Sequence, residues 1–288
     1  MRQLTDVQRS MLGRATIGDQ LRRLAQTQGN KPAIIAYGAD GSRQATTYGE
    51  LNRQANRFAH VLQSMGVGRG DGVAVMSRNR VESVIAYYGA LKVGAFYSGI
   101  SALFGEREIA QQIDHLQPAV LVVAAELGAV AGPVAERAGT QVIVVGDSPD
   151  PASRTFEALV ADAPEDEPTA DVDEHDLAMI VYTSGTESTP KGVEIAHRNY
   201  LISTAPAYTW GLRCLPDDVW LYVMPFHTIA GIGSLTSLTL LGATLVLPAS
   251  VDPGTSLKLI RDESISVLAQ TPTFFIALAN HEAFGPDT

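Results

Sequence analysis

The chain alternates short runs of apolar residues with longer stretches in which apolar residues recur every three or four positions. The runs predict strands at residues 33–37, 73–76, 95–98, 120–124, 141–145, 177–182, 219–224, 243–247 and 267–269. The spaced stretches predict helices at residues 17–28, 47–65, 79–92, 106–116, 126–138, 156–160, from about 199, and at 231–241, 256–263 and 271–280. Strands that alternate with helices predict parallel sheets joined by crossover helices. The expected fold class is therefore α/β.

Two helix starts carry capping signals. Thr47 and Glu50 have the spacing of a capping box, in which the hydroxyl accepts from the third helical amide and the carboxylate reaches back to the cap amide. Asn79 and Glu82 have the same spacing, so Asn79 is predicted to cap the next helix.

The composition changes at residues 161–176, which contain eight acidic residues, two prolines and no lysine or arginine. Such a segment is typical of a solvated linker, and an acidic docking surface is the alternative. We therefore expect two α/β subdomains, residues 1–170 and residues 177–288, with the acidic linker at about 161–176.

The overall charge excludes one class of partner. The chain has 21 basic and 31 acidic residues and a net charge of −10, so it lacks the broad positive surface that nucleic-acid binding needs. Its single cysteine, Cys214, cannot form an intramolecular disulfide, which suits a reducing compartment. The first 18 residues lack the apolar core of a secretory signal, so we expect a cytoplasmic protein.

Residues 228–251 contain no charged residue and are long enough to cross a bilayer. The stretch is interrupted at Gly242 and ends near Pro248, which favours a buried helix followed by a buried strand. No transmembrane segment is predicted.

The strongest candidate for chemistry is residues 179–193, which read MIVYTSGTESTPKGV. An apolar run ending at Tyr182 enters a loop rich in hydroxyl groups and glycine, which could present hydrogen-bond donors and the Lys191 ammonium to phosphates. The loop is not a Walker A motif, because Pro190 stands where the second glycine belongs and Gly192 follows the lysine. It is not a dinucleotide fingerprint either. On these residues alone, a phosphate site and a structural turn both remain open.

Residues 182–193 resemble the phosphate-binding signature of the adenylate-forming enzymes, which include acyl-CoA synthetases, peptide-synthetase adenylation domains and firefly luciferase. Residues 47–71, 90–95 and 223–231 resemble other blocks of this family in the same order. The resemblance is greatest to fatty-acid CoA ligases. It implies the N-terminal part of the family fold, with two αβ subdomains whose mainly parallel sheets are flanked by helices, and without the C-terminal domain.

The resemblance implies that a carboxylic acid, most simply a fatty acid, is activated with ATP and Mg²⁺ and then transferred to coenzyme A. By position, the residues that would bind the ATP phosphates are Thr183, Ser184, Gly185, Thr186, Glu187, Ser188, Thr189, Lys191 and Gly192, with Thr186 also near the metal. His227 would act at the carboxylate, and Phe226, Gly231 and Gly233 would line the acid pocket. The alternatives are an imidazole that only fills space beside Phe226, and glycines that belong to a buried structural helix.

Two features depart from the family. Glu187 and Ser188 stand where the family has threonine and glycine, and we expect the Glu187 carboxylate to point away from the phosphates. The adenine-binding segment, the ribose aspartate, the hinge and the C-terminal catalytic lysine do not appear before Thr288. We therefore expect a truncated chain that does not turn over and whose exposed apolar surface favours homo-oligomers. The alternative functions are a non-catalytic nucleotide- or acyl-binding module, and adenylation of an aryl or amino acid.

Overall fold

The structure is a computed structural model that describes residues 13–148, 150, 152–183 and 191–286. These residues form two sheets, with strand orders β2-β1-β10-β9 and β6-β5-β3-β4-β7-β8. The first sheet contains β1 (Pro32–Tyr37), β2 (Arg43–Thr47), β9 (Val219–Leu221) and β10 (Thr244–Leu247). The second contains β3 (Gly72–Met76), β4 (Phe96–Ile100), β5 (Val120–Ala124), β6 (Gln141–Val145), β7 (Leu177–Thr183) and β8 (Lys191–Ala196).

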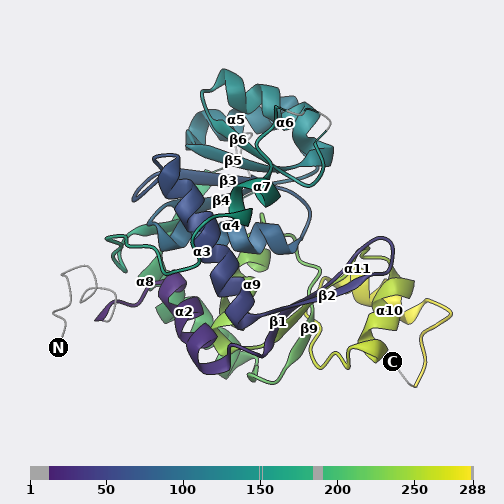
Figure 1. Cartoon of the computed structure of the whole chain (residues 1–288). Helices are drawn as coiled ribbons and strands as arrows, with labels where there is room; N and C mark the ends of the chain where they lie inside the picture. Colours follow the sequence, from purple (N-terminus) through teal and green to yellow (C-terminus); the bar gives the residue numbers. More distant parts are fainter. Residues whose placement is uncertain (1–12, 149, 151, 184–190, 287–288) are drawn as a thin grey trace.

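The helices lie between the sheets and on their outer faces (Figure 1). The main helices are α2 (Ile17–Gln28), α3 (Tyr48–Ser64), α4 (Val81–Lys92), α5 (Glu106–Leu116), α6 (Ala125–Arg137), α7 (Phe156–Ala161), α9 (Ile229–Leu241), α10 (Pro253–Asp262) and α11 (Pro272–Ala279). The largest apolar core joins α2, α3, α4 and α9 to one face of each sheet. A second core lies between α5, α6 and the far face of the larger sheet, and a third joins α10 to the far face of the smaller one. The result is a layered α/β arrangement, as predicted.

Strand β3 shows how the sequence pattern builds these layers. Successive side chains of a strand point to opposite faces. Val73 and Val75 enter the central core, whereas Ala74 and Met76 enter the core beneath α5 and α6. A strand covered on both faces reads as a continuous apolar run, which is why β3 was predictable.

The two strands that the pattern missed are edge strands. Strand β2 pairs antiparallel with β1, and β8 pairs antiparallel with β7. Most of their residues are exposed or partly exposed, so neither strand contains an apolar run. Conversely, residues 267–269 form no named strand, and Val267 makes only an isolated bridge to Trp220.

Two further local predictions differ from the structure. The helix expected from about residue 199 is a short α8 (His197–Asn199) followed by two π-helical turns, η1 (Tyr200–Thr204) and η2 (Ala207–Gly211). Pro206, which has no amide hydrogen to donate, lies between these turns. The uncharged stretch at residues 228–251 contains α9 and β10, as expected, and no helix among the described residues is long and apolar enough to span a membrane.

The caps of α3 and α4 differ from each other. Thr47 accepts a hydrogen bond from the Glu50 amide at 3.2 Å, as predicted, although the Glu50 carboxylate pairs with Arg53 and Gln54. The prediction that Asn79 caps α4 is wrong. The N-cap residue of that helix is Arg80, which makes no side-chain cap hydrogen bond.

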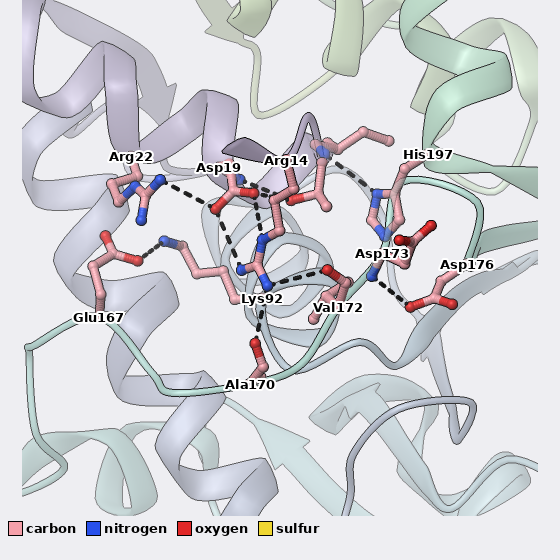
Figure 2. A network of polar contacts seen from close by, with 12 residues as sticks. Arg14, Asp19, Arg22, Lys92, Glu167, Ala170, Val172, Asp173, Asp176 and His197 are labelled. Atoms are coloured by element: carbon pink, nitrogen blue, oxygen red, sulfur yellow. Dashed lines mark hydrogen bonds and ion pairs between the residues drawn. The ribbon is translucent and has the colours of Figure 1, made fainter. Parts of the chain in front are cut away.

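The acidic segment at residues 161–176 is hydrogen-bonded along its length to the first half of the chain. Arg57 donates to the carbonyl oxygens of residues 160 and 161, and Lys92, which is buried, pairs with Glu167 at 2.6 Å. Arg14 donates to the carbonyl oxygens of residues 170 and 172 and pairs with Asp19 of α2 (Figure 2). Each sheet contains strands that precede residues 161–176 in the chain and strands that follow them. The two sheets therefore do not coincide with residues 1–170 and residues 177–288.

Candidate active site at the strand ends

Four parallel strands, two from each sheet, end at one cavity of about 310 Å³. Ser77 follows β3 and Ser101 follows β4 in the larger sheet, while Tyr222 follows β9 and Pro248 follows β10 in the smaller sheet. All four residues line the cavity. Ligands of open α/β sheets bind at the carboxyl ends of the strands, so the topology marks this cavity as the candidate site.

His227 lines this cavity from the loop between β9 and α9. Its side chain is partly buried, and this burial lowers the imidazole pKa from the usual 6.5. The ring is therefore mainly neutral at pH 7, with one N–H donor and one acceptor nitrogen. Such a group can hydrogen-bond a carboxylate or phosphate oxygen without adding a full positive charge.

The other predicted pocket residues lie close to His227 in the chain but do not line the cavity. Phe226 is buried, and its ring centroid is 5.4 Å from that of Tyr222. A Cβ atom added to Gly231 would lie 1.9 Å from the carbonyl oxygen of Pro225. A Cβ atom added to Gly233 would lie 2.8 Å from the Tyr200 hydroxyl. In this structure the space beside both glycines is taken by protein atoms.

The two ends of the predicted phosphate loop lie side by side. Thr183 of β7 pairs with Lys191 of β8, and Tyr182 pairs with Gly192. Ser184, Gly185, Thr186, Glu187, Ser188 and Thr189 lie outside the described residues. Because β7 runs parallel to β4, the loop begins at the same edge of the sheet as the strand ends that form the cavity. The fold thus brings Thr183 and Lys191, the two ends of the predicted phosphate loop, to the edge of the larger sheet that borders the His227 cavity.

One residue pair supports the base of the loop. The Tyr182 hydroxyl lies 2.6 Å from Nδ1 of His115 on α5, and the two rings pack edge to face. Burial raises the pKa of Tyr182 to about 12, so its hydroxyl stays protonated near neutral pH and can donate to the imidazole. Nothing in the sequence pattern linked these two residues.

The described residues contain no group of three or more His, Cys, Asp or Glu side chains that could hold a metal ion. Thr186, the residue predicted to lie near Mg²⁺, is outside the described part.

Sequence reasoning missed two residues that contact the loop bearing His227. Asn79 hydrogen-bonds the backbone of Met224 and Phe226, and Gly99 of β4 lies directly against the His227 backbone. Asn79 is a polar residue shortly after a predicted strand, but the same position also fits a helix cap, so the sequence does not single out its contact with this loop. The sequence gives no comparable signal for Gly99.

The chain belongs to the AMP-binding enzyme family, whose pattern it matches over residues 21–287. This match agrees with the α/β fold of the described residues.

The relatives of the chain are acid–CoA ligases. It is 32% identical over 244 residues to a crotonobetaine/carnitine–CoA ligase of Escherichia fergusonii, covering 80% of this chain and 46% of the relative. It is 29% identical over 262 residues to 4-coumarate–CoA ligase 3 of Oryza sativa subsp. japonica, covering 89% of this chain and 46% of that one. The chain thus spans about half the length of the curated relatives that it matches.

A solved structure of similar fold is the inhibitor-bound N-terminal domain of FACL13 from Mycobacterium tuberculosis, with a TM-score of 0.83 and 26% identity. The alignment covers 95% of this chain and 68% of that one. The expected family and fold class are therefore confirmed.

Proposed function

We propose that this chain carries the phosphate-binding and acid-binding half of an ATP-dependent acid–CoA ligase. The observation that carries the proposal is the placement of His227 in a cavity at the carboxyl ends of strands from both sheets, along the edge from which the phosphate loop leaves β7. The family match adds the expected chemistry.

The proposed reaction has two steps. A carboxylate oxygen of the acid attacks the α-phosphorus of ATP, the bond to the β-phosphate oxygen breaks, and pyrophosphate leaves. The thiol of coenzyme A then loses its proton and attacks the acyl carbon, and AMP leaves with the bonding electrons. The protein's contribution is to hold two anionic reactants together and to stabilise the charge that develops between them.

In this scheme the neutral imidazole of His227 donates a hydrogen bond to the carboxylate or to an α-phosphate oxygen. Thr183, Lys191 and Gly192, together with the intervening loop residues 184–189, contact the β- and γ-phosphates. These assignments rest on position in the chain and on the shared sheet edge.

The acid substrate is proposed as a fatty or aryl acid. The names of the relatives include 4-coumarate and crotonobetaine or carnitine, which are compact acids. A cavity of about 310 Å³ lies at the lower end of the usual range of ligand sites and favours a compact acid over a long extended chain. Cytoplasmic location and possible homo-oligomers stay predictions.

Direct binding tests the proposal on the 288-residue chain. Titration calorimetry with a series of non-hydrolysable acyl-sulfamoyl adenosines, carrying octanoyl, palmitoyl, benzoyl or coumaroyl groups, should give measurable affinity for at least one of them. His227→Ala should weaken that affinity about tenfold, the loss expected for one hydrogen bond to a charged group. No binding of any analogue, or equal binding by the variant, would contradict the proposed site.

The second candidate is a binding module without catalysis. It is supported by Glu187 and Ser188, which stand in the predicted phosphate loop where the family has threonine and glycine. Incubation of the chain with ATP, the preferred acid and hydroxylamine separates the two, since an acyl hydroxamate forms only if adenylation occurs. Hydroxamate formation would exclude a module without catalysis, and its absence in a chain that binds the analogues would favour that module.

A further inference from the structure

The side chain of Asn79 bridges the two sheets. Its Nδ2 group donates to the carbonyl oxygen of Met224 at 2.7 Å, and its Oδ1 atom accepts from the amide of Phe226 at 3.1 Å. The side-chain amide of Asn79 thus donates one hydrogen bond to this backbone segment and accepts one from it, which is the pattern that a paired β-strand would offer. Met224 and Phe226 flank the turn that leads directly into His227.

Asn79 does not cap its own helix. Asparagine is among the best N-cap residues, and Asn79 stands one position before the cap of α4. The cap position is instead held by Arg80, which makes no side-chain cap bond and pairs with Glu126. The strong capping side chain is therefore directed away from its own helix and toward the loop bearing His227.

Strand β4 fixes the same loop from a second direction. A Cβ atom on Gly99 would lie 2.5 Å from Cα and 2.8 Å from Cβ of His227, distances that side chains do not tolerate. The hydroxyl of Tyr97, two residues earlier, donates to the carbonyl oxygen of Phe226 at 3.4 Å. The close approach of His227 to β4 therefore requires glycine at this position.

We propose that Asn79 and Gly99 are positioning residues that set the place of His227 in the cavity, Asn79 by holding the preceding backbone and Gly99 by leaving room for it. This role deepens the proposed function and rests on it for its effect on ligand binding. The placement itself is a property of the fold and can be tested without any ligand.

Loss of both Asn79 hydrogen bonds should release the loop. The amide of Phe226 and the carbonyl of Met224 would both lose their partner. The net contribution of two hydrogen bonds corresponds to roughly a 30-fold increase in the equilibrium constant for local opening of the loop. Opening would expose the imidazole of His227 to solvent.

The first experiment measures the rate at which diethyl pyrocarbonate modifies His227, followed by peptide mass spectrometry. Asn79→Ala and Gly99→Ala should each raise this rate by about tenfold or more. Asn79→Asp keeps the acceptor for Phe226 but sets a carboxylate oxygen against the carbonyl oxygen of Met224, so it should also raise the rate. Asn52→Ala is the matched control. It removes the hydrogen bond that Asn52 of α3 donates to Glu167 at 2.7 Å, and it leaves the hydrogen bonds of Asn79 to this loop in place.

An unchanged His227 rate in a folded Asn79→Ala chain would overturn the proposal. So would an equal increase in Asn52→Ala, because that would reflect general loosening. If Asn79→Ala does not fold, the Asn79→Asp chain decides the question, since an unchanged rate there is equally contradictory.

The second experiment is a double-mutant cycle on analogue affinity. Asn79→Ala should weaken binding in the parent chain, but it should have little further effect once His227 is alanine, because the positioned group is then gone. If Asn79→Ala weakens analogue binding as much in the His227→Ala chain as in the parent chain, Asn79 does not act by positioning His227. If the parent chain binds no analogue, the proposed function fails, while the reactivity test still decides the positioning role.

Discussion

A buried histidine makes the stability of this chain depend on pH in a calculable way. His197 at the start of α8 is completely buried, and its Nδ1 atom accepts the amide hydrogen of Ile17 at 3.3 Å. Its Nε2 atom has no hydrogen-bond partner among the described residues. The ring is therefore held neutral at the point where α2, α8 and the acidic segment meet (Figure 2).

Burial lowers the pKa of His197 from 6.5 to about 4. Asp176, Asp19 and Asp173 favour the charged ring and Arg14 opposes it, but burial outweighs them. Because the folded pKa is the lower one, the unfolded chain binds more protons between pH 6.5 and pH 4, so stability falls as the pH drops through this window.

The size of the effect follows from the two pKa values. Each pH unit between them lowers the free energy of unfolding by about 1.4 kcal/mol, so the full loss below pH 4 is roughly 3 kcal/mol. At pH 5 the loss relative to pH 7 is about 2 kcal/mol. That is a large part of the stability of a typical domain.

Urea unfolding at pH 5, 6, 7 and 8 measures this dependence. His197→Asn is the test variant, since an amide oxygen can accept from Ile17 but does not titrate. The parent chain should lose about 2 kcal/mol more than the variant between pH 7 and pH 5, because the other titrating groups are common to both. His175→Asn, which removes an exposed histidine, is the control and should follow the parent. Parallel pH profiles for the parent and His197→Asn would refute the reasoning.

Three other perturbations have definite expected outcomes. Glu187→Thr should tighten ATP binding measured by calorimetry, because it removes a negative charge from the phosphate loop; unchanged or weaker binding would mean that Glu187 is not a burden. Glu167→Gln should cost about 3 kcal/mol in urea unfolding, because it removes the negative charge that compensates the buried Lys92 ammonium, whereas Lys92→Met should cost much less; equal losses would argue against this account. Gly89→Ala should lower the unfolding free energy by about 2 kcal/mol, because its Cβ would lie 2.7 Å from the Phe58 ring where α4 packs on α3; an unchanged midpoint would show that the helices shift freely.

The sequence by itself determined the periodic part of the fold. Central strands such as β3, β5 and β6 are apolar runs because they are covered on both faces, and helices such as α2 and α5 carry the three-to-four spacing of one buried face. These patterns are local, so they can be read without knowing the partners. The phosphate-loop signature is local in the same sense, and it led to the correct family.

Only the tertiary structure decided which strands share a sheet and what the polar residues at their ends contact. Strands β1 and β10 are parallel neighbours although about 200 residues separate them, and the edge strands β2 and β8 have no pattern of their own. Asn79 satisfies every local rule for a helix cap, yet its amide bonds a backbone segment 145 residues away. The reason is that a side chain's hydrogen bonds go to the groups that packing brings near, and those groups are set by the fold as a whole.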